Sequence, residues 1–130
     1  MILCPISLGE LVDKITILKI KMLKITDQNK LSNVKKEYGL LSELLQKNGL
    51  SEENVHFVQL YDLNLKFWEY HDWQRQKWSQ TQRNIIDEEL YWKNKEEHIL
   101  NDKRAEIKKN INTLYASEII EEKQFIGYAI

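Results

Sequence analysis

The chain has 130 residues, of which 42% are hydrophobic and 30% charged, so it can bury one hydrophobic core. This length predicts a single domain over residues 1–130, which we expect to be helical. Its 4 glycines and 1 proline are too few for the many turns of a β-sandwich or barrel, and we therefore expect an all-α fold. The net charge of −1 excludes a global field that attracts nucleic acid or an anionic membrane.

The first predicted helix covers residues 7–25. It starts with a capping box, in which Ser7 accepts a hydrogen bond from the amide of Glu10 and the Glu10 carboxylate reaches back to the amide of Ser7. Apolar residues then recur at alternating steps of three and four for about five turns. They are Leu8, Leu11, Ile15, Leu18, Met22 and Ile25.

The second predicted helix covers residues 30–47 and repeats this spacing. Residues 26–29 are polar and interrupt the apolar pattern, while Asn48 and Gly49 supply the left-handed residue that commonly ends a helix. Because the link between the two helices is short, we expect an antiparallel helical hairpin.

A second and longer hairpin is predicted over about residues 52–78 and 83–115. Ser51 precedes two glutamates in the first turn, where the helix dipole favours acids. Residues 79–82 are the one plausible turn between these two helices. After the hairpin, we expect a short terminal helix over residues 118–123. The predicted fold is a four-helix arrangement of two antiparallel hairpins, the second pair longer and projecting beyond the first.

The turn of the long hairpin is rich in large apolar residues, which we call the aromatic tip. An exposed apolar surface of this kind usually marks an association site. We therefore expect a homo-oligomer, most simply a homodimer, unless a shorter helix covers the tip. The candidate interface residues are Trp73, Trp78, Ile86, Tyr91 and Trp92. The leading functional hypothesis is a non-enzymatic interaction module that self-associates through them.

Polar residues also stand where the helical spacing requires apolar ones. Arg104 occupies a step of the apolar seam in the last helix, and Asn64 does so in the third. Asp72 and Arg75 lie three residues apart on one helical surface and can pair. Because an arginine keeps its charge at any realistic pH, a buried Arg104 needs a carboxylate or a bound anion. The candidate carboxylates are Glu10, Asp13 and Asp72.

Two interpretations of these polar residues remain open. In the first, they form an internal ion-pair network that fixes the register of the helices. In the second, they line a pocket between helices that binds an anionic small molecule, such as a phosphorylated compound or a sugar nucleotide, for binding or catalysis. The candidate ligand-binding residues are Glu10, Asp13, Lys14, Asn64, Asp72, Arg75, Asp102, Arg104 and Lys108.

We assign no metal and no cofactor. Glu53 and His56 have the spacing of di-metal helical bundles, but those bundles need two such pairs, and no second pair is present. Carboxylates three residues apart, such as Glu10 with Asp13, hold magnesium in helical nucleotide pyrophosphohydrolases, but the spacing is common on helices. The glycines are scattered and form no phosphate-binding loop.

The compartment follows from cysteine use and from the N-terminus. Cys4 is the single cysteine, so no disulfide can form within the chain, and a reducing compartment is favoured. The N-terminus has no basic segment followed by a long apolar stretch, and no run approaches the roughly 20 apolar residues that span a bilayer. We expect a cytoplasmic protein with no membrane partner.

Four stretches of the sequence resemble one known family. They are residues 5–21 (PISLGELVDKITILKIK); Leu63-Asn64 with Trp68, Asp72 and Arg75; residues 101–105 (NDKRA) with Ile107, Lys108, Ile111 and Asn112; and residues 117–123 (SEIIEEK). Together they resemble a small uncharacterised all-helical family found in bacteria and their phages, over nearly the whole chain. The resemblance implies a helical fold and carries no assigned activity.

The resemblance also implies that certain polar residues belong to the pattern of the family, and these largely coincide with the seam positions above. The sequence departs from that pattern at residues 92–99, where a helical segment of small residues is expected, and at His71, where an acid is expected. The matching polar residues are Glu10, Asp13, Lys14, Asn64, Asp72, Arg75, Asn101, Asp102, Arg104, Lys108 and Asn112.

Overall fold

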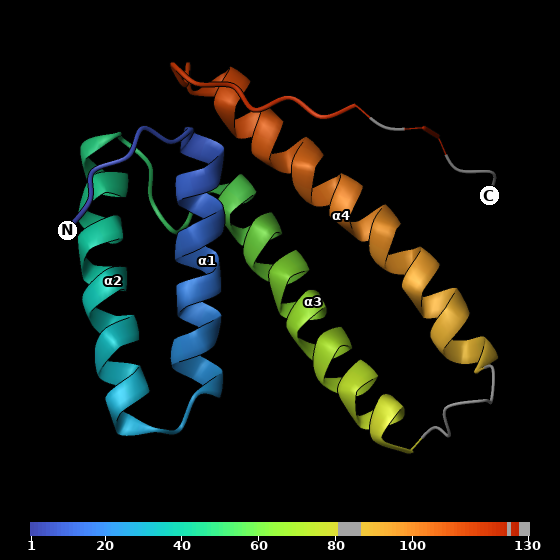
Figure 1. Ribbon diagram of the computed structural model, residues 1–130. Coiled ribbons are helices and arrows are strands. Elements are labelled where there is room, and N and C mark those ends of the chain that lie inside the picture. The colour runs from blue at the N-terminus through green and yellow to red at the C-terminus, as the bar shows by residue number, and fades with distance from the viewer. Residues whose placement is uncertain (81–86, 125, 128–130) are drawn as a thin grey trace.

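The computed structural model describes residues 1–80, 87–124 and 126–127, and these residues form four helices and no strand. The helices are α1 (Leu8–Lys24), α2 (Gln28–Lys47), α3 (Val55–Gln80) and α4 (Glu88–Leu114). They pair as two antiparallel hairpins, with 17 and 20 residues in the helices of the first and 26 and 27 in those of the second (Figure 1). The predicted all-α fold of two unequal hairpins is confirmed.

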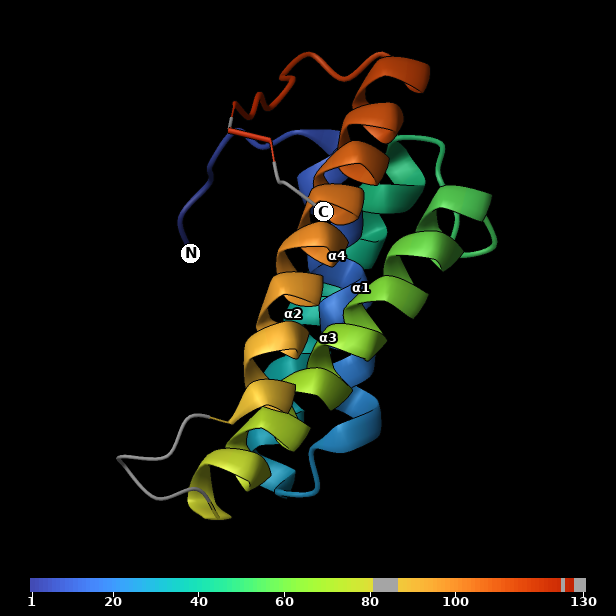
Figure 2. The ribbon, with the colours of Figure 1, turned by 90° about the vertical axis from the view of Figure 1, so that its right-hand side faces the viewer.

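Helix α1 lies at the centre of the molecule. It packs against each of the other three helices, whereas α2 packs on α1 alone and α4 packs on α1 and α3 (Figure 2). Ile15 and Thr16 are adjacent in the sequence and so point to different sides of α1, while Ile20 shares a face with Thr16. Each of the three is at most 1% exposed. A helix that is buried on several sides needs apolar residues around most of its circumference, as α1 has. The core around it contains Leu11, Val12, Ile15, Leu45, Leu50, Phe57, Leu60 and Ile111.

The long hairpin is buried at the end that meets α1. The buried residues of α3 lie between Phe57 and Phe67, and those of α4 are Ile111 and Asn112. The opposite end of the hairpin, beside residues 81–86, diverges from α1 and α2 (Figure 1). The long hairpin therefore projects from the body, as the sequence predicts.

Side-chain caps set the starts of the helices. Ser7 and Asp87 each accept a hydrogen bond, 3.1 Å long, from the backbone amide three residues later. Helix α3 begins at Val55 instead of residue 52, because Asn54 provides its cap and accepts from the amide two residues later at 2.9 Å. The predicted start of the fourth helix, residues 83–86, lies outside the described residues.

The chain after α4 does not form the expected helix over residues 118–123. Ala116 has a φ of 52°, which ends α4, and the amide of Ser117 donates to the carbonyl of Asn112 at 2.8 Å. Residues 117–124, which we call the C-terminal strap, then run back along α4 as an irregular segment (Figure 1). Several side chains of the strap bond to α1 and α4, and these contacts replace a helical hydrogen-bond pattern.

Candidate functional site

The N-terminus of α1 is held by side chains from the end of α4 and from the strap. The amide of Leu8 donates to the Ser117 hydroxyl at 3.1 Å, and the amide of Gly9 donates to Oδ1 of Asn112 at 2.7 Å. The Ser7 hydroxyl donates to Glu121 at 2.7 Å while it accepts from the amide of residue 10. The free amides of the first turn are thus satisfied within the protein, so this helix end is not itself an anion site.

Half of the predicted capping box is formed. The Ser7 side chain caps the helix as expected, but the Glu10 carboxylate turns away from the Ser7 amide. It accepts a hydrogen bond from Nζ of Lys108 at 2.6 Å and lies 3.8 Å from Nζ of Lys14. A partly buried lysine on α4 therefore replaces the local amide as the partner of this carboxylate.

Gly9 allows α1 and α4 to cross in near contact. A Cβ atom at this position would lie 2.5 Å from the backbone carbonyl oxygen of Lys108, closer than van der Waals contact permits. No larger residue fits without moving one of the two helices. This crossing fixes the position along α4 that faces the first turn of α1, and so brings Lys108 and Asn112 to that turn.

A chain of buried polar side chains joins α1, α3 and α4. Nδ2 of Asn64 donates to Oδ1 of Asp13 at 2.8 Å and to the Thr16 hydroxyl at 2.9 Å. Oδ1 of Asn64 accepts from Nη1 of Arg104 at 3.3 Å. The Asn64 amide therefore bridges a buried carboxylate and a guanidinium that do not touch. This part of the network fits the interpretation that polar residues fix helix register.

Arg104 is oriented on three sides and has no carboxylate partner in the described part of the chain. Besides Asn64, it donates from Nη2 to Oδ1 of Asn101 at 2.5 Å, and its guanidinium lies 4.6 Å from the centre of the Phe67 ring. None of the ion pairs among the described residues includes it. Its remaining N–H donors have no partner among the residues that the structure describes.

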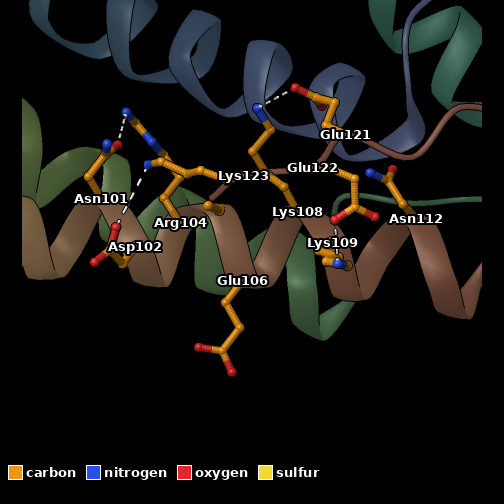
Figure 3. A pocket seen from close by; sticks show the side chains of 11 residues that line it. Asn101, Asp102, Arg104, Glu106, Lys108, Lys109, Asn112, Glu121, Glu122 and Lys123 are labelled. Carbon is orange, nitrogen blue, oxygen red and sulfur yellow. Dashed lines mark hydrogen bonds and ion pairs between the residues drawn. The ribbon is translucent and has the colours of Figure 1, made fainter. Parts of the chain in front are cut away.

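A cavity of about 490 Å³ lies beside Arg104, between α4 and the strap (Figure 3). Ion pairs connect its two walls: Lys123 to Asp102 at 3.7 Å, and Lys109 to Glu122 at 2.8 Å. The cavity is lined by Asn101, Asp102, Arg104, Ala105, Glu106, Lys108, Lys109, Asn112, Glu121, Glu122 and Lys123.

Most charges around the cavity cancel in pairs. Lys108 bonds to Glu10 and lies 3.7 Å from Glu121, and the strap pairs above neutralise two more lysines. Glu106 points away from the other lining side chains (Figure 3). Arg104 is therefore the cation on this wall whose charge is not balanced by a contacting carboxylate.

Asn112 supplies a second unused donor. The residue is 1% exposed, and its Oδ1 accepts from the Gly9 amide. Its Nδ2 has no hydrogen-bond partner among the described residues. A buried donor without a partner costs about 1–3 kcal/mol. An oxygen of a bound molecule in the cavity would remove this cost.

The carboxyl group of Glu10 is perturbed by the same surroundings. Burial alone would raise its pKa, but the hydrogen bond and charge of Lys108, with the charges of Lys14 and Arg104, lower the pKa below its ordinary value. Glu10 is therefore ionised at neutral pH and neutralises Lys108.

The structure brings together most of the predicted ligand-binding residues. Glu10, Asp13, Asn64, Arg104 and Lys108 form one connected region between α1, α3 and α4. In addition, Lys14 touches the region through Glu10, and Asp102 lines the cavity.

Asp72 and Arg75 lie apart from this region. Both are exposed on the second half of α3, and no ion pair joins them. Their positions continue the seam of α3, but α3 diverges from α1 toward its C-terminal end (Figure 1).

The apolar spacing did not indicate some residues that take part in the polar contacts of the site. Thr16 is buried beside a seam position, and its hydroxyl links Asp13 and Asn64. Ser117 and Glu121 lie in the strap, which has no apolar period that would place it against α1. Ser117 and Glu121 lie within residues 117–123, a stretch that resembles the family, but the sequence gives neither of them a role.

The aromatic tip is largely open to solvent. Trp78 and Tyr91 are each 57% exposed and Trp92 is 53% exposed, while Trp73 is partly buried and packs on Tyr70. The fifth predicted interface residue, Ile86, lies outside the described residues.

Two kinds of feature are absent from the described residues. No group of three or more histidine, cysteine, aspartate or glutamate side chains is arranged to hold a metal ion. No helix among them combines the length and the apolar composition needed to cross a membrane.

Comparison with known proteins identifies the family of the chain but not an activity. No curated protein and no solved structure matches the sequence significantly. One family model matches residues 2–129, almost the entire chain, which agrees with the extent of the resemblance noted in the sequence. The chain belongs to DUF6165, a family of unknown function.

Proposed function

We propose that the protein binds a small organic anion in the cavity between α4 and the C-terminal strap. The observation that carries the proposal is the state of Arg104. This guanidinium is partly buried and held in place by Asn64, Asn101 and Phe67. Within the described part of the chain, it touches no carboxylate and has unused donors beside the cavity. A phosphate or carboxylate group supplies both the missing charge and the missing acceptors.

The alternative is that Arg104 only fixes helix register. It accounts for the contacts on one side of the guanidinium. It explains the bond to Asn64, which connects the guanidinium to Asp13 on α1. It does not explain the donors on the opposite side, or the neighbouring cavity, whose volume of about 490 Å³ lies within the range of small-molecule sites.

A thermal-unfolding screen tests the proposal. Purified protein is heated with phosphate, sugar phosphates, sugar nucleotides and dicarboxylates, each well above millimolar concentration. A ligand at 100 times its dissociation constant stabilises the folded state by about 2.7 kcal/mol, which raises the midpoint by on the order of 10 °C at this chain length.

The decisive variant is Arg104→Gln, which removes the charge but keeps a polar side chain. We expect it to lose the ligand-induced shift, while the matched variant Arg75→Gln, at an exposed arginine on α3, keeps it. The proposal is wrong if no anion shifts the midpoint of the wild-type protein, or if the shift survives in a folded Arg104→Gln protein.

We propose self-association through the aromatic tip as a second function. The supporting observation is that Trp78 of α3 and Tyr91 and Trp92 of α4 each expose more than half of their surface. Large exposed aromatic side chains on both helices of one hairpin are typical of an interface. This function needs no ligand and is compatible with the first.

The setting that we propose is the cytoplasm of a bacterium or of a cell infected by its phage. The lone thiol of Cys4 is exposed, and such a thiol stays reduced in that compartment. The bacterial or phage source follows from the resemblance of residues 5–21 and is part of the same proposal.

A further inference from the structure

We propose that the ligand is an elongated molecule that the cavity holds at two ends. Its anionic group binds Arg104, and a hydroxyl or carbonyl oxygen at its other end accepts a hydrogen bond from Nδ2 of Asn112. This inference rests on the proposed function, since it specifies the class of anion that the same cavity binds.

The two binding groups lie on one face of α4. Arg104, Lys108 and Asn112 are spaced four residues apart, so their side chains share one side of the helix. The backbone positions of Arg104 and Asn112 are separated by about 12 Å along its axis. Figure 3 shows these three side chains on the same side of α4, with the strap beside them. An isolated phosphate at Arg104 cannot reach Asn112 over this distance.

The two ends differ in chemistry. Arg104 offers a charge without a contacting carboxylate, which requires an anion. Asn112 offers a neutral amide donor, because its oxygen is fixed by the amide of Gly9, and this fixes the direction of its nitrogen. A neutral oxygen is its fitting partner.

The middle of the cavity favours an uncharged segment. Lys108 lies between the two ends, but its ammonium group is bound to Glu10 and lies next to Glu121. The neighbouring Ala105 adds no polar group to the wall. A sugar ring or a similar hydroxylated body between the anion and the far oxygen fits this arrangement better than a second charged group.

The experiment compares probes of increasing length and a nearly isosteric variant. Dissociation constants are measured by calorimetry for inorganic phosphate, glucose 6-phosphate and UDP-glucose, which share a phosphate group. In the wild-type protein, we expect at least one extended probe to bind about tenfold or more tightly than phosphate, because it adds the contact to Asn112.

The variant Asn112→Asp keeps the acceptor for the Gly9 amide and removes the donor. Its carboxylate lies at the N-terminus of α1, where the helix dipole favours a negative charge, so the fold is retained. We expect binding of the preferred extended probe to weaken about tenfold, with phosphate binding within about twofold, because a charge about 12 Å away is largely screened. Asn110→Asp, an exposed position on α4, is the matched control.

The outcomes separate this inference from the proposed function. If phosphate binds as tightly as both extended probes, or if Asn112→Asp weakens all probes equally or none, the two-ended site is wrong while the anion site at Arg104 stands. If none of the probes binds, and no anion in the broader screen gives a midpoint shift that Arg104→Gln abolishes, both the two-ended site and the anion site are wrong. The wild-type probe series decides the question even if Asn112→Asp does not fold.

Discussion

Glu10 is the carboxylate on which three cations of the site act. Lys108, Lys14 and Arg104 all favour its ionised form, and their combined effect lowers its pKa below the ordinary value of 4.5 in spite of burial. Because the folded-state pKa is below the unfolded one, Glu10 stabilises the fold above about pH 4.5. This contribution is lost as the pH falls through the folded-state pKa.

The variant Glu10→Gln measures this contribution. At pH 7 we expect its free energy of unfolding to be lower than that of the wild type by about 1 kcal/mol or less, since the pair with Lys108 is partly exposed to solvent. At pH 3 the two proteins should be nearly equally stable in urea unfolding. Glu37→Gln, at an exposed position of α2 that forms no ion pair with any described residue, should match the wild type at both pH values. A loss in Glu10→Gln that is as large at pH 3 as at pH 7 contradicts this account.

The burial of a polar site residue was predictable from the sequence where another helix packs against the predicted face of its own helix. Arg104 and Asn64 interrupt apolar seams, and the structure shows both between packed helices. Asp72 and Arg75 interrupt a seam in the same way but lie on the surface, because α1 and α3 have already separated at that level. The spacing within one helix gives the direction of a side chain, but the position of the neighbouring helix decides whether it is buried.

At the scale of elements, the crossing of α1 and α4 depends on the missing side chain of Gly9. Gly9→Ala places a methyl group 2.5 Å from the carbonyl oxygen of Lys108, which is backbone and cannot swing aside. We expect a loss of about 1–3 kcal/mol in the free energy of unfolding, measured with urea. Because the crossing also sets Asn112 against α1, ligand binding should weaken in the same variant.

Gly39→Ala is the matched control for this prediction. Gly39 lies within α2, and apart from its chain neighbours and the nearby backbone of its own helix, no described atom lies within 4 Å of the position that its Cβ would occupy. Alanine has the higher helix propensity, so this variant should be more stable than the wild type by about 0.5–1 kcal/mol. If both glycine variants change stability in the same direction, the close crossing does not account for the effect of Gly9→Ala.

The helices were predictable because their caps and their periods are local signals. Ser7 and the apolar steps after it define α1 within two residues, and a short polar link specifies an antiparallel neighbour. The strap was not predictable in this way. Its conformation depends on Glu121, Glu122 and Lys123, whose partners lie 13 to 114 residues away in the sequence. Charged residues in a short segment do not reveal such distant partners.

At the scale of the whole molecule, the two proposed functions use opposite ends of the long hairpin. The cavity lies at the end that packs on α1, where Ile111 and Asn112 are buried. The aromatic tip lies at the other end, which diverges from the body (Figure 1). A change at the tip should therefore alter association and leave ligand binding intact.

The double variant Trp78→Lys and Trp92→Lys tests association at the tip. Both side chains are more than half exposed, so two lysines should not disturb the core, but their charges oppose the burial of this surface in a dimer. By light scattering, we expect the wild type to have about twice the monomer mass of 15.6 kDa and the variant to have the monomer mass. Leu40→Lys with Leu44→Lys adds the same charge to exposed positions on α2 and should leave the dimer intact. A wild-type protein that stays monomeric at high concentration, or a dimer that survives the tryptophan changes, excludes the tip as the interface.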